Sequence, residues 1–95
     1  MTNTTESYFL SYSGVRLPLK LTSPLAVDEL ENRNTYIIAR HDAGRLVEVI
    51  RMVYGDTELR HLYQYHDNGA LKQAEITMGG ETRVLDFDEE GKPAG

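Results

Sequence analysis

The chain has 95 residues, no cysteine and a formal net charge of -5, from 10 basic and 15 acidic side chains. This length accommodates one small domain over residues 1–95, and the lack of cysteine excludes disulfides, thiolate metal sites and cysteine nucleophiles. The acidic balance disfavours nucleic acid as a partner, and no apolar run approaches the ~18 residues of a membrane-spanning helix.

The first part of the sequence indicates an N-terminal β-hairpin over residues 8–21. Tyr8, Leu10 and Tyr12 fall at every second position, and 15–21 repeats the alternation, which is the pattern of strands with one buried face. Ser13-Gly14 can form the turn between them. Pro18 has no N–H for a sheet ladder, so the second strand is expected at a sheet edge.

One short helix is expected near residues 25–32. Asp28 followed by Glu31 fits a variant of the capping box, and asparagines at 32 and 34 can end the helix within two turns.

From Thr35 onward the sequence indicates a five-strand meander over residues 35–88. The candidate strands are 35–41, 45–54, 57–66, 70–78 and 81–88, and the connectors are Asp42-Ala43-Gly44, Gly55-Asp56, Asp67-Asn68-Gly69 and Gly79-Gly80. Each connector contains glycine, which tolerates the positive φ of tight hairpin turns. Residues 89–95 are expected to form a flexible tail. The predicted fold is therefore all-β, an antiparallel meander of about seven strands arranged as a curled sheet, a sandwich or a partly open barrel.

The turns also predict a register, because a one-residue slip would reverse every side chain of a strand. Pairing 54 with 57 and 66 with 70 gives two apolar faces. The first holds Ile37, Ala39, Val47, Val49, Val53, Leu62, Ala74, Ile76, Leu85 and Phe87; the second holds Tyr36, Ile38, Leu46, Ile50, Met52, Tyr54, Leu59, His61, Tyr63, Tyr65, Leu71 and Val84. Something must cover each face, and an uncovered patch of this kind favours a binding surface.

The second face is the predicted binding site, with Tyr36, Tyr54, His61, Tyr63, Tyr65 and Glu75 as its candidate residues. Tyrosines offer a large contact area at low entropic cost, although they are also common strand residues at the edge of a core. In this register His61 faces Glu75, an arrangement that orients a general base, but the sequence places no nucleophile nearby. No enzymatic activity and no catalytic residues are therefore predicted.

The similar stretches "HDAGRL" at 41–46 and "HDNGAL" at 66–71 are interpreted as turns. Adjacent hairpins lie about 10 Å apart, so the two histidines are too far apart to share one zinc ion with ligands near 2 Å. Aspartate can accept backbone hydrogen bonds in such turns while glycine supplies the positive φ. No metal site and no cofactor are expected.

The segment "YQYHDNGAL", a tyrosine before an Asp-x-Gly turn with leucine two residues after the glycine, resembles the tyrosine–aspartate (YD) hairpin repeats of Rhs-type bacterial proteins. The likeness covers residues 35–92 and departs from the repeat at Arg40 and at the histidine before each aspartate. The whole chain also resembles a small bacterial family of unknown function. Both resemblances imply a fold and no activity.

The sequence thus predicts a cytoplasmic protein-interaction module that binds a protein partner, or a second copy of itself, through the tyrosine-rich face or an edge strand. The alternative is a small-molecule-binding β-domain with a tyrosine-lined pocket.

Overall fold

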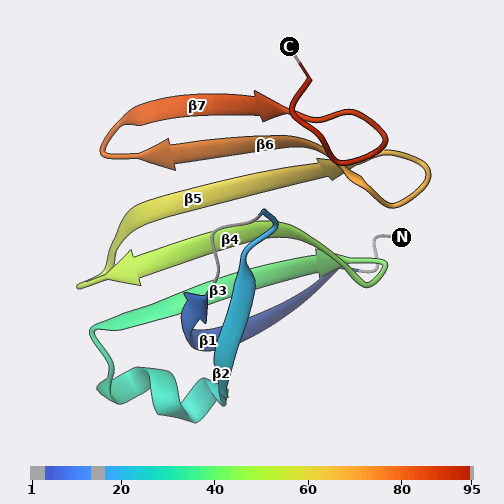
Figure 1. The fold of residues 1–95 in the computed structure, drawn as a ribbon. Coiled ribbons are helices and arrows are strands. Elements are labelled where there is room, and N and C mark those ends of the chain that lie inside the picture. Colours follow the sequence, from blue (N-terminus) through green and yellow to red (C-terminus); the bar gives the residue numbers. More distant parts are fainter. Residues whose placement is uncertain (1–3, 14–16, 95) are drawn as a thin grey trace.

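In the computed structural model, which describes residues 4–13 and 17–94, seven strands form one antiparallel sheet (Figure 1). The strands are β1 (Thr4–Ser13), β2 (Lys20–Leu25), β3 (Thr35–Asp42), β4 (Arg45–Val53), β5 (Asp56–Tyr65), β6 (Leu71–Met78) and β7 (Glu81–Asp86). The predicted all-β fold is confirmed, and the bounds of β3 to β7 fall within two residues of the predicted ones.

The order of the strands departs from a simple meander at the N-terminus. It runs β2-β1-β3-β4-β5-β6-β7, so β1 pairs with both β2 and β3. The chain passes from the edge strand β2 to the far side of β1 through the short helix η1 (Val27–Asn32). Because β2 and β7 are the two edges, the described part of the sheet does not close into a barrel.

The short helix is confirmed, but its predicted cap is wrong. η1 is a 3-10 helix whose N-cap is Ala26, and no side chain caps it. Asp28 lies inside the first turn, where its charge favours the positive end of the helix without serving as the cap.

The N-terminal hairpin is observed with a different second strand. Leu21 pairs with Tyr12, so the two segments meet as predicted, and β2 is an edge strand. Pro18 precedes β2 and therefore does not occupy a ladder position; Pro24 does. The predicted turn residue Gly14 and residues 15–16 lie outside the described residues.

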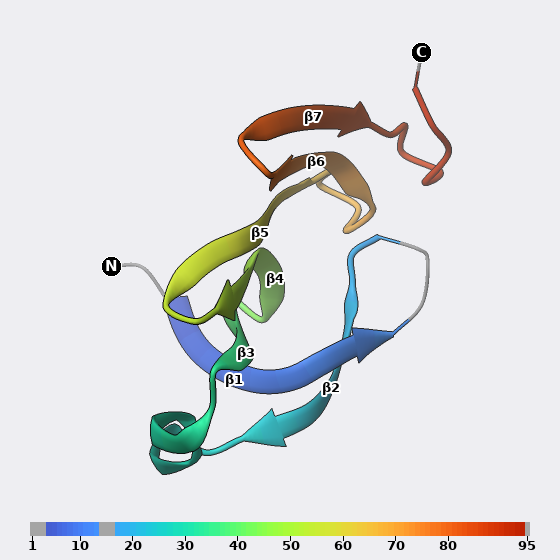
Figure 2. The same cartoon turned by 90° about the vertical axis from the view of Figure 1, so that its left-hand side faces the viewer.

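One face of the sheet carries the hydrophobic core, and we call it the covered face. Its buried side chains come from β3, β4, β5 and β6: Ile37, Ala39, Val49, Leu59, His61, Tyr63 and Ala74. Leu17, Leu19 and Leu21 pack against this cluster, so the segment leading into β2 folds over the sheet. Figure 2 shows the resulting curl, with β1 and β2 wrapping around one side of the sheet.

The turn between β4 and β5 lies one residue earlier than predicted. Tyr54 and Gly55 form it with φ of 50° and 83°, and Val53 pairs with Asp56. This pair of positive φ angles is typical of the tight turns that match the twist of a hairpin. Glycine suits such a position, but tyrosine seldom adopts it, which is why sequence reasoning placed the turn at Gly55-Asp56.

Strand β5 is consequently turned over relative to the predicted register. A β-bulge after Arg51 combines with the earlier turn to pair Val49 with His61 instead of Leu62. A second bulge after Gln64 restores the predicted orientation of β6. The predicted faces are therefore correct for most of β3, β4 and β6 and wrong for β5, because a shift of one residue reverses a strand.

The end of the chain folds back on the sheet where the sequence predicted a flexible tail. Phe87 forms an isolated bridge with Pro93, and the Ala94 N–H donates to the Asp86 carbonyl at 2.9 Å.

Candidate functional site

The predicted tyrosine face is divided in the structure. Tyr63 is 3% exposed on the covered face, whereas Tyr36 lies on the opposite face, paired with Met52. Tyr54 forms the β4–β5 turn and is 74% exposed. Tyr65 follows the second bulge and packs against the core. The tyrosines therefore do not form one continuous surface, and that part of the prediction is wrong.

The predicted contact between His61 and Glu75 is also wrong. His61 pairs with Ile76 on the covered face, whereas Glu75 pairs with Leu62 on the other face. The reversal of β5 separates the two side chains, so a carboxylate-oriented histidine does not arise here.

His61 instead belongs to a buried hydrogen-bonded chain. The Leu19 N–H donates to the Tyr63 hydroxyl at 3.2 Å, and that hydroxyl lies 2.7 Å from His61 Nδ1. The Tyr63 hydroxyl therefore bonds at once to the backbone of the N-terminal segment and to the His61 ring. Burial lowers the pKa of His61, and it raises the pKa of Tyr63 to about 12. These three groups attach the N-terminal segment to the sheet.

The opposite face of strands β1, β3, β4 and β5 is here called the outer face. By register it carries Glu6, Tyr8, Tyr36, Ile38, Arg40, Glu48, Ile50, Met52, Arg60 and Leu62. Its apolar members are partly exposed, in contrast to the buried cluster on the covered face. The outer face therefore presents apolar and aromatic surface beside a set of charges.

The central charges form one row across four neighbouring strands. Arg40 contacts both Glu6, at 3.2 Å, and Glu48, while Arg60 contacts Glu48 at 2.6 Å. The Glu48 side chain is only 6% exposed, against 41% for Glu6 and Arg40 and 48% for Arg60. Sequence reasoning missed this row because it followed the apolar residues, although charges stand at alternating strand positions in the same segments.

One end of the row is joined to an aromatic pair. The Tyr8 hydroxyl donates to Glu6 at 2.6 Å, and the Tyr8 and Tyr36 rings meet edge to face with centroids 6.5 Å apart. Hydrogen bonds from Tyr8 and then Arg40 lower the pKa of Glu6, and the same bond to Glu6 raises the pKa of Tyr8. Glu6 therefore keeps its charge, and the row alternates in sign from β1 to β5.

A cleft of about 480 Å³ lies where β4 and β5 separate. Its walls are Asp42, Ala43, Arg45, Val47, Tyr63, Gln64 and Tyr65. The Arg45 guanidinium carbon lies 5.7 Å from the centroid of the Tyr65 ring, within range of a cation–π contact. This cleft, which we call the seam cleft, is the place where two predicted binding residues, Tyr63 and Tyr65, come together.

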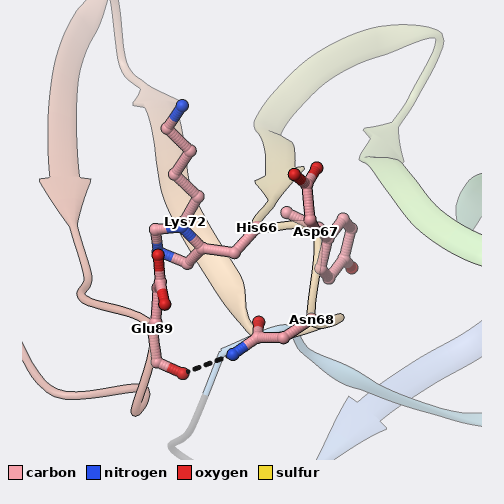
Figure 3. Close-up of a pocket in the computed structure, with 6 residues that line it drawn as sticks. His66, Asp67, Asn68, Lys72 and Glu89 are labelled. Carbon is pink, nitrogen blue, oxygen red and sulfur yellow. Dashed lines mark hydrogen bonds between the residues drawn. The ribbon is translucent and has the colours of Figure 1, made fainter.

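A second hollow, of about 270 Å³, lies between the loops at the same end of the sheet (Figure 3). The Asn68 amide donates to the Glu89 carbonyl at 2.9 Å, and the His66 ring lies 2.9 Å from the Phe87 carbonyl. These side chains hold two loops together. The packing of these two loops against each other therefore accounts for the hollow.

The two His-Asp stretches differ in structure. Ala43 and Gly44, with φ of 52° and 82°, make a two-residue turn, and Asp42 pairs with Arg45. Residues 66–70 make a longer loop, in which the His66 N–H donates to the Ala70 carbonyl and the Gly69 N–H to the His66 carbonyl.

The longer loop recurs at 88–92. There the Asp88 N–H donates to the Lys92 carbonyl and the Gly91 N–H to the Asp88 carbonyl, in the same arrangement. In these two loops the side-chain acceptors of backbone N–H groups are Asn68 and Asp88. Sequence reasoning assigned that role to the aspartates that follow His41 and His66.

Over residues 4–13 and 17–94, no group of three or more histidine, aspartate or glutamate side chains is arranged to hold a metal ion. Within the same ranges, no helix is long and apolar enough to cross a membrane.

A model described as Family of unknown function (DUF6156) matches residues 1–95. The chain belongs to this family. Membership of DUF6156 agrees with the predicted resemblance to a family of unknown function and carries no activity with it. No curated protein and no solved structure matches the chain.

Proposed function

We propose that this DUF6156 protein is a non-enzymatic interaction module that associates with a second copy of itself through the outer face. The observation that carries the proposal is the row Glu6, Arg40, Glu48 and Arg60, which alternates in sign across β1, β3, β4 and β5. An alternating row of four charges is complementary to itself when reversed.

A two-fold axis parallel to the strands, between β3 and β4, produces that reversal. It brings Arg40 opposite the partner's Glu48, and Glu6 close to the partner's Arg60, whose side chain reaches the row from the next ladder pair. Such an interface uses the same patch on both copies, as most homodimers do. An axis along the row would instead place each charge opposite itself, so the charges select one of the two orientations.

The apolar side chains that flank the row supply the affinity. Tyr8, Tyr36, Ile38, Ile50 and Met52 are partly exposed on the outer face; all but Tyr8, which is on β1, lie on the two strands that flank the proposed axis. Exposed ion pairs contribute at most about 1 kcal/mol each, so the row determines orientation more than strength. The curl of the sheet limits the contact area, and we expect a weak dimer that high salt weakens further.

Sedimentation equilibrium over a range from micromolar to millimolar protein tests this proposal. We expect a reversible monomer–dimer equilibrium. Ile50→Lys adds a cation beside Arg60 at the centre of the face and should abolish dimers. Glu6→Lys places a cation opposite the partner's Arg60 and should weaken association by about 10-fold or more.

Val27→Lys is the matched control, because Val27 is 68% exposed in η1 and lies off the outer face. It should associate like the wild type, and circular dichroism of each variant checks that the sheet is formed. A wild-type protein that stays monomeric throughout, or unchanged association of both outer-face variants, would overturn the proposal.

We also propose that the protein is cytoplasmic, in keeping with a chain that has no cysteine and therefore no disulfide. We also propose that the hairpins after Thr35 are related to YD repeats, supported by the shared hydrogen-bond pattern of the loops at 66–70 and 88–92.

A further inference from the structure

The seam between β4 and β5 is open at one end. Pairing between the two strands runs from Val53 and Asp56 to Glu48 and Leu62, and no described pair continues it. Beyond that point β4 is paired only with β3, and β5 only with β6. Figure 1 shows β5 diverging from β4 toward its C-terminal end.

The divergence leaves ladder positions facing a space instead of a neighbouring strand. Val47 and Gln64 lie on its two sides. The Tyr65 hydroxyl crosses the space and donates to the Leu46 carbonyl, which satisfies one acceptor that a paired strand would have used. The remaining opening is the seam cleft of about 480 Å³.

The cleft combines aromatic walls with a cation that has no partner among the described carboxylates. Arg45 forms none of the ion pairs found in residues 4–13 and 17–94, and its guanidinium lies over the Tyr65 ring. A guanidinium held by an aromatic ring keeps donors free for a carboxylate, which it binds through two parallel hydrogen bonds. Asp42 is paired in register with Arg45 and is exposed, and it forms no ion pair with Arg45 in the described residues.

We propose that the seam cleft binds a small aromatic carboxylate. The carboxylate engages Arg45, and the ring lies between Val47 and the Tyr65 side of the opening. The cleft combines apolar and aromatic walls with three polar side chains, Asp42, Arg45 and Gln64, and a few polar groups among apolar walls are the usual composition of small-ligand sites. The site lies apart from the charged row of the outer face, so this proposal and the proposed dimer can fail separately.

Nuclear magnetic resonance titration with benzoate tests the proposal. We expect saturable shifts of the backbone amides of Val47, Gln64 and Tyr65. Benzamide has the same shape without the charge and should bind at least about 10-fold more weakly. Inorganic phosphate, an anion without a ring, should also bind more weakly, which separates aromatic carboxylate binding from general anion binding.

Arg45→Gln should weaken benzoate binding by about 10-fold or more. Arg51→Gln is the matched control, because Arg51 lies on the same strand and pairs with Glu58; it should bind benzoate like the wild type. Preserved amide spectra outside the cleft establish that each variant is folded. Equal binding of benzoate and benzamide, equal or tighter binding of phosphate, or full benzoate binding by Arg45→Gln would overturn the proposal.

Discussion

Two buried polar residues of this sheet are held by very different partners. His61, 5% exposed, is held by the neutral hydroxyl of Tyr63, whereas Glu48, also 5% exposed, is held by two arginines. A buried polar group is costly unless it is hydrogen-bonded, and a buried charge requires a charged partner. His61 is therefore expected to respond to pH, and Glu48 to the loss of its charge.

Acid should destabilise the fold through His61. Burial holds its pKa in the native state below the ordinary value of 6.5, so as pH falls below 6.5 the unfolded chain binds a proton that the native chain resists. Stability is then lost as pH falls toward the lowered pKa. His61→Asn keeps an acceptor near Tyr63 and cannot titrate, so urea unfolding at several pH values should show a shallower pH dependence. An unchanged slope would mean that His61 does not contribute.

Removing the charge of Glu48 should destabilise the fold. Glu48→Gln leaves Arg40 and Arg60 without their shared carboxylate and should lower the free energy of unfolding by about 1–3 kcal/mol. The matched control is Glu58→Gln, which breaks the exposed ion pair with Arg51. It should lower the free energy of unfolding by less than about 0.5 kcal/mol. If urea unfolding shows the same loss of stability for both variants, the buried Glu48 contributes no more than an exposed ion pair does.

At the scale of elements, the strands could be predicted because their apolar residues alternate and glycine marks every turn from β3 to β7. The register could not be predicted, because it depends on bulges after Arg40, Arg51 and Gln64 and on Tyr54 adopting a positive φ. Neither feature has a sequence signal as strong as glycine. The error reversed β5 alone, and this moved Tyr63 and His61 from the predicted site into the core.

A substitution at Tyr54 should make the β4–β5 turn more stable. Tyr54→Asn places a residue that adopts left-handed geometry more readily before Gly55, and should stabilise the protein by about 0.5–1 kcal/mol. Gly55→Ala, at φ 83°, should destabilise it by about 1 kcal/mol. Thermal unfolding of the two variants checks both signs, and a destabilised Tyr54→Asn would argue against this turn.

At the scale of the whole molecule, the fold has one core and two surfaces with different chemistry. The segment from Leu17 to Leu21 covers one face of the sheet, and the charged row and its apolar neighbours occupy the other. The sequence indicated two apolar faces and a binding surface, but not which residues it carries. The row and Arg45 became visible only once the register was fixed, because both depend on contacts between strands.

The assignment of the β5 side chains to the two faces depends on the pairing of β4 with β5. Cross-strand nuclear Overhauser contacts in isotope-labelled protein measure it directly. The structure predicts contacts that pair Val49 with His61 and, one strand further, His61 with Ile76. Contacts that pair Val49 with Leu62 would instead turn His61 and Tyr63 to the outer face and contradict the account.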